Sequence, residues 1–432
     1  MRKSISGAVT VALWASLLQV SPGHAEDGSG AFQVASADVT VSLRPALRPS
    51  AQEYRVATEG NARFQAWLGA FRKRALEQGI SAGTLDRSLT GLTYDKDVIK
   101  RDRNQAEFSK PIWDYLDSAV SSKRIAGGRA GLDDYSQTLN KIEKKYGVEK
   151  EVVTAIWGLE TSYGSFKGGD QTIRSLATLA FDARRAQFFE AQLVAALQIV
   201  EAGDVAPSNM VGSWAGAMGH TQFMPTSYLE HAVDFDRDGR RDIWADDPTD
   251  ALASAASYLA RHGWKKGQPW GVEVRLPEGF DYSQARRDYT LKPSQWARQG
   301  VVTPQGRAVP NHGKAAILLP AGGQGVALMV FDNFRVIEKY NSADAYVIGV
   351  GHLSDRLAGG APFQGAWPRG DRVLSFTEKK ELQTRLTEAG FDTQGVDGRT
   401  GPNTANAVRE YQLAQGLVPD GYPSLRLLER LR

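Results

Sequence analysis

Apolar residues recur every three or four positions over most of the chain, which is the spacing that places them on one face of an α-helix. Glycine follows several of these stripes, as is common at the C-terminal ends of helices. The clearest stripes are Phe64, Trp67, Leu68, Phe71 and Ala75 before Gly79; Leu132, Tyr135, Leu139, Ile142 and Tyr146 before Gly147; and Phe189, Leu193, Leu197 and Val200 before Gly203. The pattern predicts a mainly α-helical protein whose first helix starts near Asn61.

One stretch departs from the helical spacing. Between Gly271 and Val330, short runs such as VEVRL, AAILL and VALMV alternate with Pro and Gly, which is typical of strands joined by turns. Helical spacing returns from Phe334 to Leu357. We therefore expect one domain over residues 59–357, helical but with a small strand-containing insert.

A separate unit is predicted at the C-terminal end. Residues 358–372 are rich in Gly and Pro and are expected to form a linker. Residues 373–432 carry their own apolar pattern with glycines at the turns, which predicts a small three-helix domain. Its expected core is Leu382, Leu386, Ala407, Val408, Tyr411 and Leu417.

The N-terminal end has the pattern of an export signal. Arg2 and Lys3 precede an apolar run from Ala8 to Val20, and small residues follow up to Ala25. Cleavage is expected after Ala25, which makes the first 25 residues a signal peptide. An uncleaved anchor is the alternative, although the run is short for a membrane span of ~20 residues. Residues 26–58 lack sustained periodicity and are expected to be a flexible spacer.

Composition and charge narrow the class of protein. With 42% hydrophobic and 23% charged residues, the chain has the composition of an ordinary globular protein. Its formal net charge of +3 falls to +1 without Arg2 and Lys3, which is too small to indicate nucleic acid as a partner. The sequence has no cysteine, so we expect neither disulfides nor a lipid attachment site at the cleavage point. The prediction is a periplasmic protein without a membrane anchor.

The stretch VEKEVVTAIWGLETSYG, residues 148–164, places a carboxyl group on an apolar helical face. Val153, Ile156, Trp157 and Glu160 share that face. Burial beside Trp157 would raise the pKa of Glu160 from about 4.3 toward about 6, at a cost of roughly 2 kcal/mol. A carboxyl group that keeps its proton near neutral pH can act as a general acid. The alternative is a glutamate whose carboxylate reaches the surface at the last turn of the helix.

The glycine-rich segment SWAGAMGHTQFMPTSY, residues 213–228, offers a second group of candidate residues. Ser213, Gln222, Phe223 and Tyr228 bring hydroxyl, amide and aromatic groups together, and the glycines leave backbone open to close approach. Sugars suit this mixture, because aromatic faces pack on their CH surfaces while neutral donors and acceptors bind their hydroxyl and acetamide groups. The same residues are also consistent with a tightly packed glycine-rich turn.

Several motifs agree in identity and order with one enzyme family. They are AIWGLETSYG, GAMGHTQFMPTSY, DFDRDGRRDIW, YLARHGW and EKYNSADAYVIGVGHL. From about Asn61 to Leu357 the chain resembles the lytic murein transglycosylase B family. The resemblance implies a lysozyme-like helical catalytic domain that cleaves peptidoglycan between N-acetylmuramic acid and N-acetylglucosamine, with Glu160 as the sole catalytic acid and base. The implied glycan-cleft residues are Ser213, Gln222, Phe223, Tyr258, Tyr340, Tyr346 and, by a looser match, Tyr115.

Residues 373–432 resemble the peptidoglycan-binding type 1 domain through VDGRTGPNT, AVREYQ and GLVPDG. The resemblance implies that this domain holds the enzyme on the cell wall and raises the local substrate concentration. The expected binding partner is the glycan strands of peptidoglycan. Other cell-wall enzymes are further expected partners, in complexes with this protein. One departure is the missing cysteine of the lipoprotein members, which argues against lipid anchoring.

The segment after the glycine-rich one contains a possible calcium loop. Asp234, Asp236 and Asp238 alternate before Gly239, as in the first half of an EF-hand loop. The twelfth position holds Ala245 in place of glutamate, and the resembling family uses a late aspartate there. The candidate metal ligands are Asp234, Asp236, Asp238, Arg240 and Asp250. Any calcium is expected to be structural, no cofactor is expected for the chemistry, and a solvated acidic loop is the alternative.

Three functions are compatible with the sequence. The first is a lytic transglycosylase that forms 1,6-anhydromuramoyl ends without using water. A second carboxyl group, which most glycoside hydrolases place at a set distance from the first, is not evident near these motifs. The second function is a muramidase that lets water attack. The third is a wall-binding scaffold without catalysis.

Overall fold

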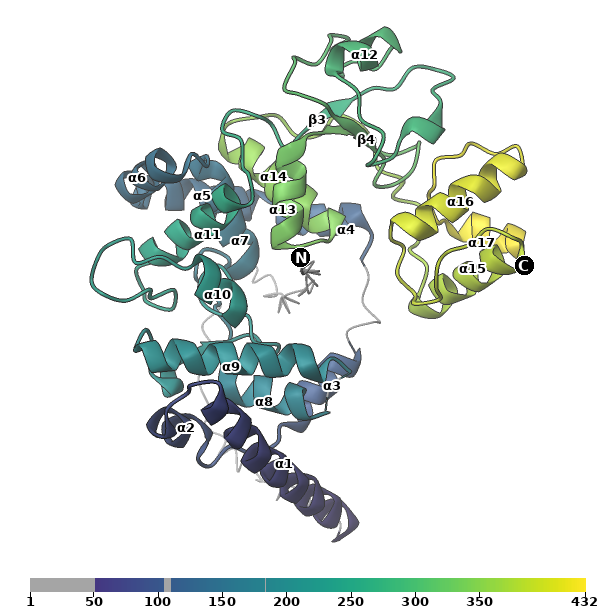
Figure 1. Ribbon diagram of the computed structural model, residues 1–432. Helices are drawn as coiled ribbons and strands as arrows, with labels where there is room; N and C mark the ends of the chain where they lie inside the picture. The colour runs from purple at the N-terminus through teal and green to yellow at the C-terminus, as the bar shows by residue number, and fades with distance from the viewer. Residues whose placement is uncertain (1–50, 105–109, 183) are drawn as a thin grey trace, which may run out of the picture.

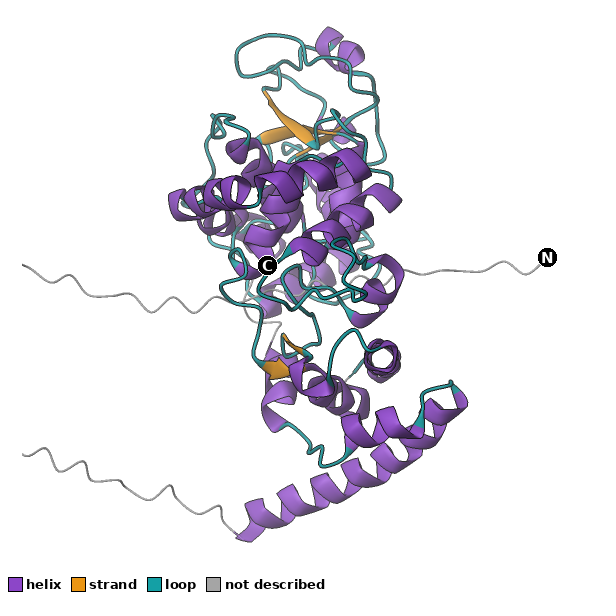
Figure 2. Ribbon diagram, turned by 90° about the vertical axis from the view of Figure 1, so that its left-hand side faces the viewer, coloured by secondary structure: helices purple, strands orange, loops and turns teal. Residues whose placement is uncertain are grey.

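The computed structural model describes residues 51–104, 110–182 and 184–432, so the predicted signal peptide and most of the predicted spacer lie outside the described residues. Helices dominate this part of the chain (Figures 1 and 2), as the sequence predicts. Within the described ranges, no helix is both long and apolar enough to cross a membrane.

The large domain is built mainly of α-helices. Its first helices are α1 (Ala51–Glu77), α2 (Ala82–Leu89), α3 (Lys96–Asn104), α4 (Ile112–Ala119), α5 (Ser122–Asp134), α6 (Ser136–Tyr146), α7 (Lys150–Thr161), α8 (Thr172–Asp182) and α9 (Ala186–Ala202). The later helices of the large domain are α10 (Pro225–His231), α11 (Thr249–Arg261), α12 (Pro293–Arg298), α13 (Asp332–Tyr340) and α14 (Asp344–Leu357). Helix α1 begins at Ala51, not near Asn61, and continues through Gly60, because a single glycine lowers helix propensity without ending a helix.

Helix α7 is the centre of this arrangement. It packs against α5, α6, α11 and α14, and residues 152–158 are buried along its whole circumference. A helix that is apolar on all sides has to be enclosed by other elements. Glu160 lies two positions after this buried stretch. The helix therefore places it at the edge of the protein interior.

The stripe expected over residues 132–146 is two helices, not one. Helix α5 ends at Asp134, and α6 starts at Ser136, because Tyr135 has φ −107° and ψ 23°. The sequence pattern does not predict α5, whose glycines have a low helix propensity. Packing outweighs that propensity, since aromatic side chains lie directly on the bare backbone of α5.

Two of these glycines leave little or no room for a Cβ atom. A Cβ on Gly128 would lie 2.6 Å from Cδ2 of Leu357 and 2.7 Å from the hydroxyl of Tyr163. A Cβ on Gly131 would lie 3.1 Å from Cζ3 of Trp157. The glycines of α5 therefore set how closely α5 approaches α7.

The strand-containing insert is confirmed. Strands β3 (Gly271–Val274), β4 (Ala316–Leu318) and β5 (Ala327–Val330) form an antiparallel sheet in the order β3-β5-β4, with Val330 opposite both Gly271 and Ala316. The insert has its own apolar core around the fully buried Trp296. A second, smaller sheet pairs β1 (Asp170–Gln171) with β2 (Val211–Gly212).

The C-terminal helices are α15 (Phe376–Glu388), α16 (Pro402–Ala414) and α17 (Leu425–Leu431), drawn in yellow in Figure 1. They enclose the core expected from the sequence, with Leu417 only partly buried. These helices contact the insert: Arg409 Nη2 donates to the carbonyl of Ala285 at 3.0 Å, and the amide of Gly323 donates to Asp420 at 3.0 Å. The C-terminal residues are thus docked against the insert in this structure.

The predicted linker is also held by contacts. The ring of Phe363 stacks on His352 with centroids 3.8 Å apart, and Arg369 forms an ion pair with Asp117 at 2.7 Å. Both carboxylate oxygens of Glu273 accept from the amide of Gln364. The residues expected to form a linker therefore follow a defined path along the large domain.

One glycine fixes the loop that follows α7. Gly168 has φ +91°, and a Cβ on it would lie 2.1 Å from the carbonyl oxygen of Gly212. The backbone of this loop thus touches the backbone at the start of the glycine-rich segment. The neighbouring Gly169 has no atom within 4 Å of an added Cβ.

Gly168→Ala is expected to lower the free energy of unfolding by at least ~2 kcal/mol, because a methyl group meets backbone atoms at a residue with positive φ. Gly169→Ala should change it by no more than about 0.5 kcal/mol. Chemical denaturation of the two variants measures the difference, and equal stabilities would contradict the backbone contact.

Candidate active site

Helix α7 ends at Thr161, one residue after Glu160. Ser162 and Tyr163 both have positive φ, at 49° and 61°, which costs on the order of 1 kcal/mol for each residue that is not glycine. Hydrogen bonds compensate: the hydroxyl of Tyr163 donates to the carbonyl of Arg124 at 2.7 Å, and Arg124 Nη1 donates to Ser162 Oγ at 3.3 Å. The left-handed turn thus starts at Ser162, two residues before the first glycine, Gly164.

The carboxyl group of Glu160 lies among aromatic side chains and keeps only part of its surface exposed. Burial raises its pKa to about 7, and a hydrogen bond that Tyr346 donates to Oε1 at 2.6 Å acts in the opposite direction. Within the described ranges, no second carboxyl group contributes to this shift. The upward direction agrees with the sequence expectation for a glutamate on an apolar face.

Three tyrosines surround Glu160. Tyr340 and Tyr346 stack in parallel, with centroids 6.4 Å apart and planes 6° from each other. The hydroxyl of Tyr340 donates to the carbonyl of Thr221 at 2.5 Å, which ties α13 to the glycine-rich segment. Burial first, and then the charge of Glu160, raise the pKa of Tyr115, Tyr340 and Tyr346. All three side chains therefore stay neutral and can donate hydrogen bonds.

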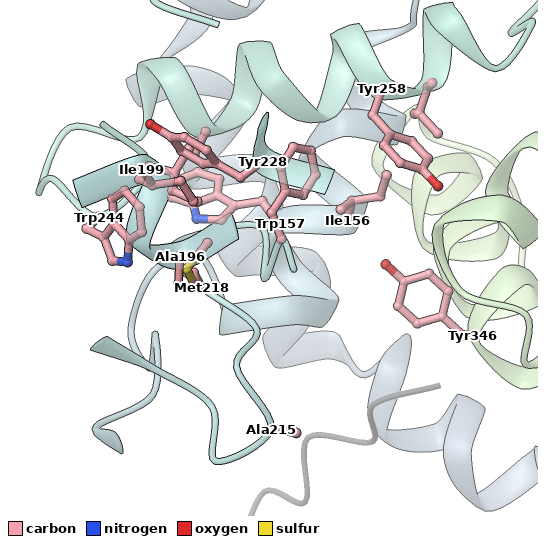
Figure 3. Close-up of a cluster of buried hydrophobic side chains, with 14 of the residues drawn as sticks. Ile156, Trp157, Ala196, Ile199, Ala215, Met218, Tyr228, Trp244, Tyr258 and Tyr346 are labelled. Atoms are coloured by element: carbon pink, nitrogen blue, oxygen red, sulfur yellow. The ribbon is translucent and has the colours of Figure 1, made fainter. Parts of the chain in front are cut away.

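Phe223 and Tyr258 form a layer behind Tyr340. Their ring centroids lie 5.8 Å and 5.0 Å from that of Tyr340, and the hydroxyl of Tyr258 donates to the carbonyl of Lys339 at 2.6 Å. Figure 3 shows Tyr258 and Tyr346 on the side of Ile156, and Trp157, Tyr228, Trp244 and Met218 gathered on the other side. With 2% and 9% of their surfaces exposed, Phe223 and Tyr258 have little area left for a ligand.

Ser213 and Gln222 are bonded within their own segment. The amide of Ala217 donates to Ser213 Oγ at 3.0 Å, and Gln222 Nε2 donates to the carbonyls of Gly219 at 2.9 Å and Lys167 at 3.1 Å. Both side chains keep part of their surface exposed. The structure thus shows the tightly bonded turn that the sequence allowed, without removing these groups from solvent.

Sequence reasoning missed the residues that hold the end of α7. His220 accepts a hydrogen bond from Trp157 Nε1 at 3.0 Å, and its carbonyl accepts one from Thr161 Oγ1 at 2.8 Å. Arg124 comes from the unpredicted helix α5. The only sequence signal was the presence of Trp157 and His220 inside the two recognised motifs, because nothing in a linear pattern pairs residues 63 positions apart.

The acidic loop, residues 234–250, brings three of its carboxyl groups together. Oxygen atoms of Asp234, Asp236 and Asp250 all lie within 4.8 Å of one another. Burial, and then the charge of Asp236, raise the pKa of Asp250 to about 6, although its oxygens accept from the amides of Phe235 and Asp242. Such crowding of hard oxygen atoms suits Ca²⁺.

The other two candidate ligands play a different part in the loop. Asp238 lies outside the group of three carboxylates, and its Oδ1 accepts from the amide of Arg240 at 2.8 Å. Gly239 has φ +91°, as the turn of such a loop requires. The fold of the loop fits a bound cation that is held mainly by Asp234, Asp236 and Asp250.

Comparison with known proteins agrees with this geometry. The transglycosylase SLT domain family matches residues 63–355, and a peptidoglycan binding domain family matches residues 377–431. The membrane-bound lytic murein transglycosylase B of Escherichia coli (strain K12) is 35% identical over 251 residues, which are 56% of this chain. The chain covers 66% of the length of that relative.

Solved structures extend the likeness beyond the large domain. SltB3 from Pseudomonas aeruginosa, in complex with NAG-anhNAM-pentapeptide, is 48% identical with a TM-score of 0.83, over 85% of this chain and 99% of that one. The Escherichia coli lytic transglycosylase Slt35 in complex with calcium is 29% identical with a TM-score of 0.58, over 69% of this chain and 93% of that one. Family match, fold and the order of the motifs agree, and this chain belongs to the lytic murein transglycosylase B family, with a C-terminal domain of the peptidoglycan-binding type.

Proposed function

We propose that this protein is a lytic transglycosylase that cleaves the β-1,4 bond between N-acetylmuramic acid and N-acetylglucosamine in peptidoglycan. The observation that carries the proposal is the carboxyl group of Glu160, with its pKa raised to about 7 and no second carboxyl group of the described residues acting on it. A group that is partly protonated at neutral pH can both give and take a proton. The muropeptide bound by SltB3 supports peptidoglycan as the substrate class.

In the proposed reaction, protonated Glu160 donates its proton to the glycosidic oxygen while the bond from that oxygen to C1 of the muramic acid breaks. The positive charge that develops at C1 is quenched when the C6 hydroxyl oxygen of the same sugar attacks C1. The hydroxyl proton passes to the carboxylate of Glu160, which restores the acid. No water is consumed, and the product is a 1,6-anhydromuramoyl end.

The surroundings of Glu160 support this cycle. Tyr346 donates to Oε1 at 2.6 Å, which stabilises the carboxylate between the two proton transfers and fixes its orientation. Tyr115 and Tyr340 add neutral aromatic surface near the same carboxyl group. We propose Tyr115, Tyr340, Ser213 and Gln222, which keep part of their surface exposed, as glycan-binding residues. Tyr346, which is 6% exposed, orients Glu160, and Phe223 and Tyr258 support Tyr340 from behind.

Four further parts of the proposal concern the rest of the chain. We propose that residues 1–25 direct export to the periplasm and that the predicted spacer, residues 26–58, precedes the catalytic domain, with residues 51–58 forming the first turns of α1. Residues 373–432 would bind the cell wall. Asp234, Asp236 and Asp250, with Asp238 and Arg240, would hold a structural Ca²⁺, as the calcium complex of Slt35 suggests.

Muropeptide analysis separates the three functions. Purified sacculi are digested and the products are weighed by mass spectrometry. Anhydro ends, which are one water lighter than reducing ends, are the expected result. Reducing ends would show a hydrolytic muramidase, and the absence of released products would show a scaffold.

Glu160→Gln should lower the rate of glycan cleavage at least ~100-fold, because general acid catalysis typically supplies ~100- to 10,000-fold. The glutamine oxygen can still accept from Tyr346, so the fold should be retained. Initial rates on sacculi and a circular dichroism spectrum measure both points. A folded variant with near wild-type turnover would remove Glu160 from the mechanism.

The same substitution should raise stability at high pH. Between pH 4.5 and about 7 the unfolded glutamate has lost its proton while the folded one keeps it, so the stability of the wild type falls as pH rises through this window. Glu160→Gln abolishes that loss and should gain on the order of 3 kcal/mol at pH 8 relative to pH 4. Denaturation curves at both pH values test this, with the exposed Glu388→Gln as a control that should show no such gain.

Calcium should raise the melting temperature by several degrees, because a ligand that binds only the folded state stabilises it. A chelator should reverse the gain, and Asp236→Ala combined with Asp238→Ala should abolish it. The pair Asp133→Ala and Asp134→Ala removes the same charge from exposed positions of α5 and should leave the calcium response intact. A calcium response that persists when Asp236→Ala and Asp238→Ala are combined would mean that the loop is an acidic segment that does not bind the ion.

Removal of residues 373–432 should leave the large domain folded, since its core is separate from that of the C-terminal helices. Cleavage of soluble glycan fragments should stay within about twofold, and cleavage of sacculi should fall, because tethering acts through effective concentration. Equal losses on both substrates would show that the C-terminal domain completes the active site. The isolated domain should pellet with sacculi without cleaving them.

A further inference from the structure

His220 connects the catalytic helix to the acidic loop through its ring. Its Nδ1 accepts from Trp157 Nε1 at 3.0 Å, and its Nε2 lies 2.7 Å from the carbonyl oxygen of Ala245. An indole N–H can only donate, so Nδ1 must be the acceptor and the ring carries its proton on Nε2, which donates to Ala245. The ring is therefore neutral and engaged at both ends.

The backbone of His220 repeats this connection. Its amide donates to the carbonyl of Ile243 at 3.0 Å, and its carbonyl accepts from Thr161 Oγ1 at 2.8 Å. On the far side, the ring lies against Gly164, where a Cβ would be 2.5 Å from Cε1 of the imidazole. Only 3% of the surface of His220 is exposed. The residue thus fills the space between the end of α7 and the second half of the acidic loop.

Lys167 makes a parallel connection from the loop that follows α7. Its ammonium group donates to the carbonyls of Trp244 at 2.7 Å and Ala245 at 3.1 Å, and its side chain is only 22% exposed. Its own carbonyl accepts from Gln222 Nε2 at 3.1 Å. A lysine normally keeps its ammonium group in water, so its use on two backbone carbonyls indicates a structural task.

The segment that receives these bonds is itself fixed to the acidic loop. The amides of Trp244 and Ala245 donate to Asp242 Oδ1 at 2.8 Å and 2.9 Å. The amide of Asp242 donates to Asp250 Oδ2 at 3.0 Å. A continuous set of hydrogen bonds therefore runs from Asp250 to the two residues, Trp157 and Thr161, that lie three positions before and one position after Glu160.

We propose that His220 and Lys167 are positioning residues, which hold the end of α7 against the acidic loop and so place the carboxyl group of Glu160 against Tyr346. The proposal rests on the proposed function, because placement of Glu160 matters to the rate only if Glu160 is the catalytic acid. His220 acts through Trp157 and Thr161, and Lys167 acts through the loop after α7 and Gln222. Burial lowers the pKa of His220, which favours the neutral ring that this arrangement needs.

A positioning role predicts a particular kinetic pattern. A misplaced acid weakens transition-state stabilisation and leaves ground-state binding nearly unchanged, so kcat falls while KM does not rise. A displacement of about 1 Å can cost ~100-fold in rate. Loss of a glycan contact would raise KM instead, and a merely structural role would lower stability without either kinetic change.

The test uses the full-length protein and a soluble glycan fragment. His220→Leu should lower kcat by ~10- to 100-fold with KM within about threefold, and the residual product should still carry anhydro ends. His220→Asn keeps an acceptor for Trp157, and His220→Gln keeps a donor for Ala245. Each should recover part of the lost kcat, because each restores one of the two contacts.

Lys167→Met should lower kcat by a smaller factor of ~3 to 10, and the double variant with His220→Leu should lose less than the product of the two factors, since both residues act on the same segment. Hydrogen exchange of residues 242–245 should become faster in Lys167→Met. Two controls are matched to these changes. Lys123→Met removes an exposed lysine of α5, and Leu179→Ala destabilises the core of α8 away from this connection; both should keep wild-type kcat.

The outcomes separate this inference from the proposed function. An active Glu160→Gln variant would overturn the proposed function whatever His220 does. An inactive Glu160→Gln variant together with wild-type kcat in His220→Leu would overturn only the positioning role, as would a rise in KM at unchanged kcat. If His220→Leu does not fold, the Asn and Gln variants decide, and wild-type kcat in both would overturn the inference.

Discussion

The structure depends on keeping one carboxyl group away from bulk water at the end of a helix that is apolar on every side. Helix α7 can be buried only because α5, α6, α11 and α14 close around it, and that enclosure raises the pKa of Glu160 to about 7. The unfavourable burial is offset by one strong hydrogen bond, from Tyr346, and by the packing of the rest of the helix. The contacts that bury α7 therefore stabilise the fold and also raise the pKa of the proposed catalytic acid.

The sequence was sufficient to predict those elements whose hydrophobic pattern can be seen within a short window. The apolar face that carries Glu160, the alternating runs of the insert and the core of the C-terminal helices are each visible within short windows, and the structure confirms them. Motif order was sufficient for the family, because several short matches had to agree at once. The direction of the pKa shift of Glu160 followed from the residues beside it on the helix.

The remainder of the site depends on contacts between distant residues. Tyr346 reaches Glu160 across 186 positions, and no periodicity indicates that pairing. Helix α5 was missed because its glycines oppose helix formation locally, while Trp157 and Tyr163 stabilise it from outside the helix. Composition predicted a linker over residues 358–372, but it does not reveal that Glu273 and Asp117 hold this segment through polar contacts.

The glycines of α5 limit which substitutions the protein can accept during evolution. The space beside each glycine is already filled by neighbouring side chains. These are Tyr163 and Leu357 at Gly128, and Trp157 at Gly131. A larger residue at Gly128 would displace Leu357 and Tyr163, and one at Gly131 would require a small shift of Trp157, while a smaller neighbour alone leaves a void. Either single step is expected to lower stability, so the two residues of each contact are expected to change together. The scaffold around Glu160 is thus held in place by mutational coupling, in addition to any selection on the catalytic residue itself.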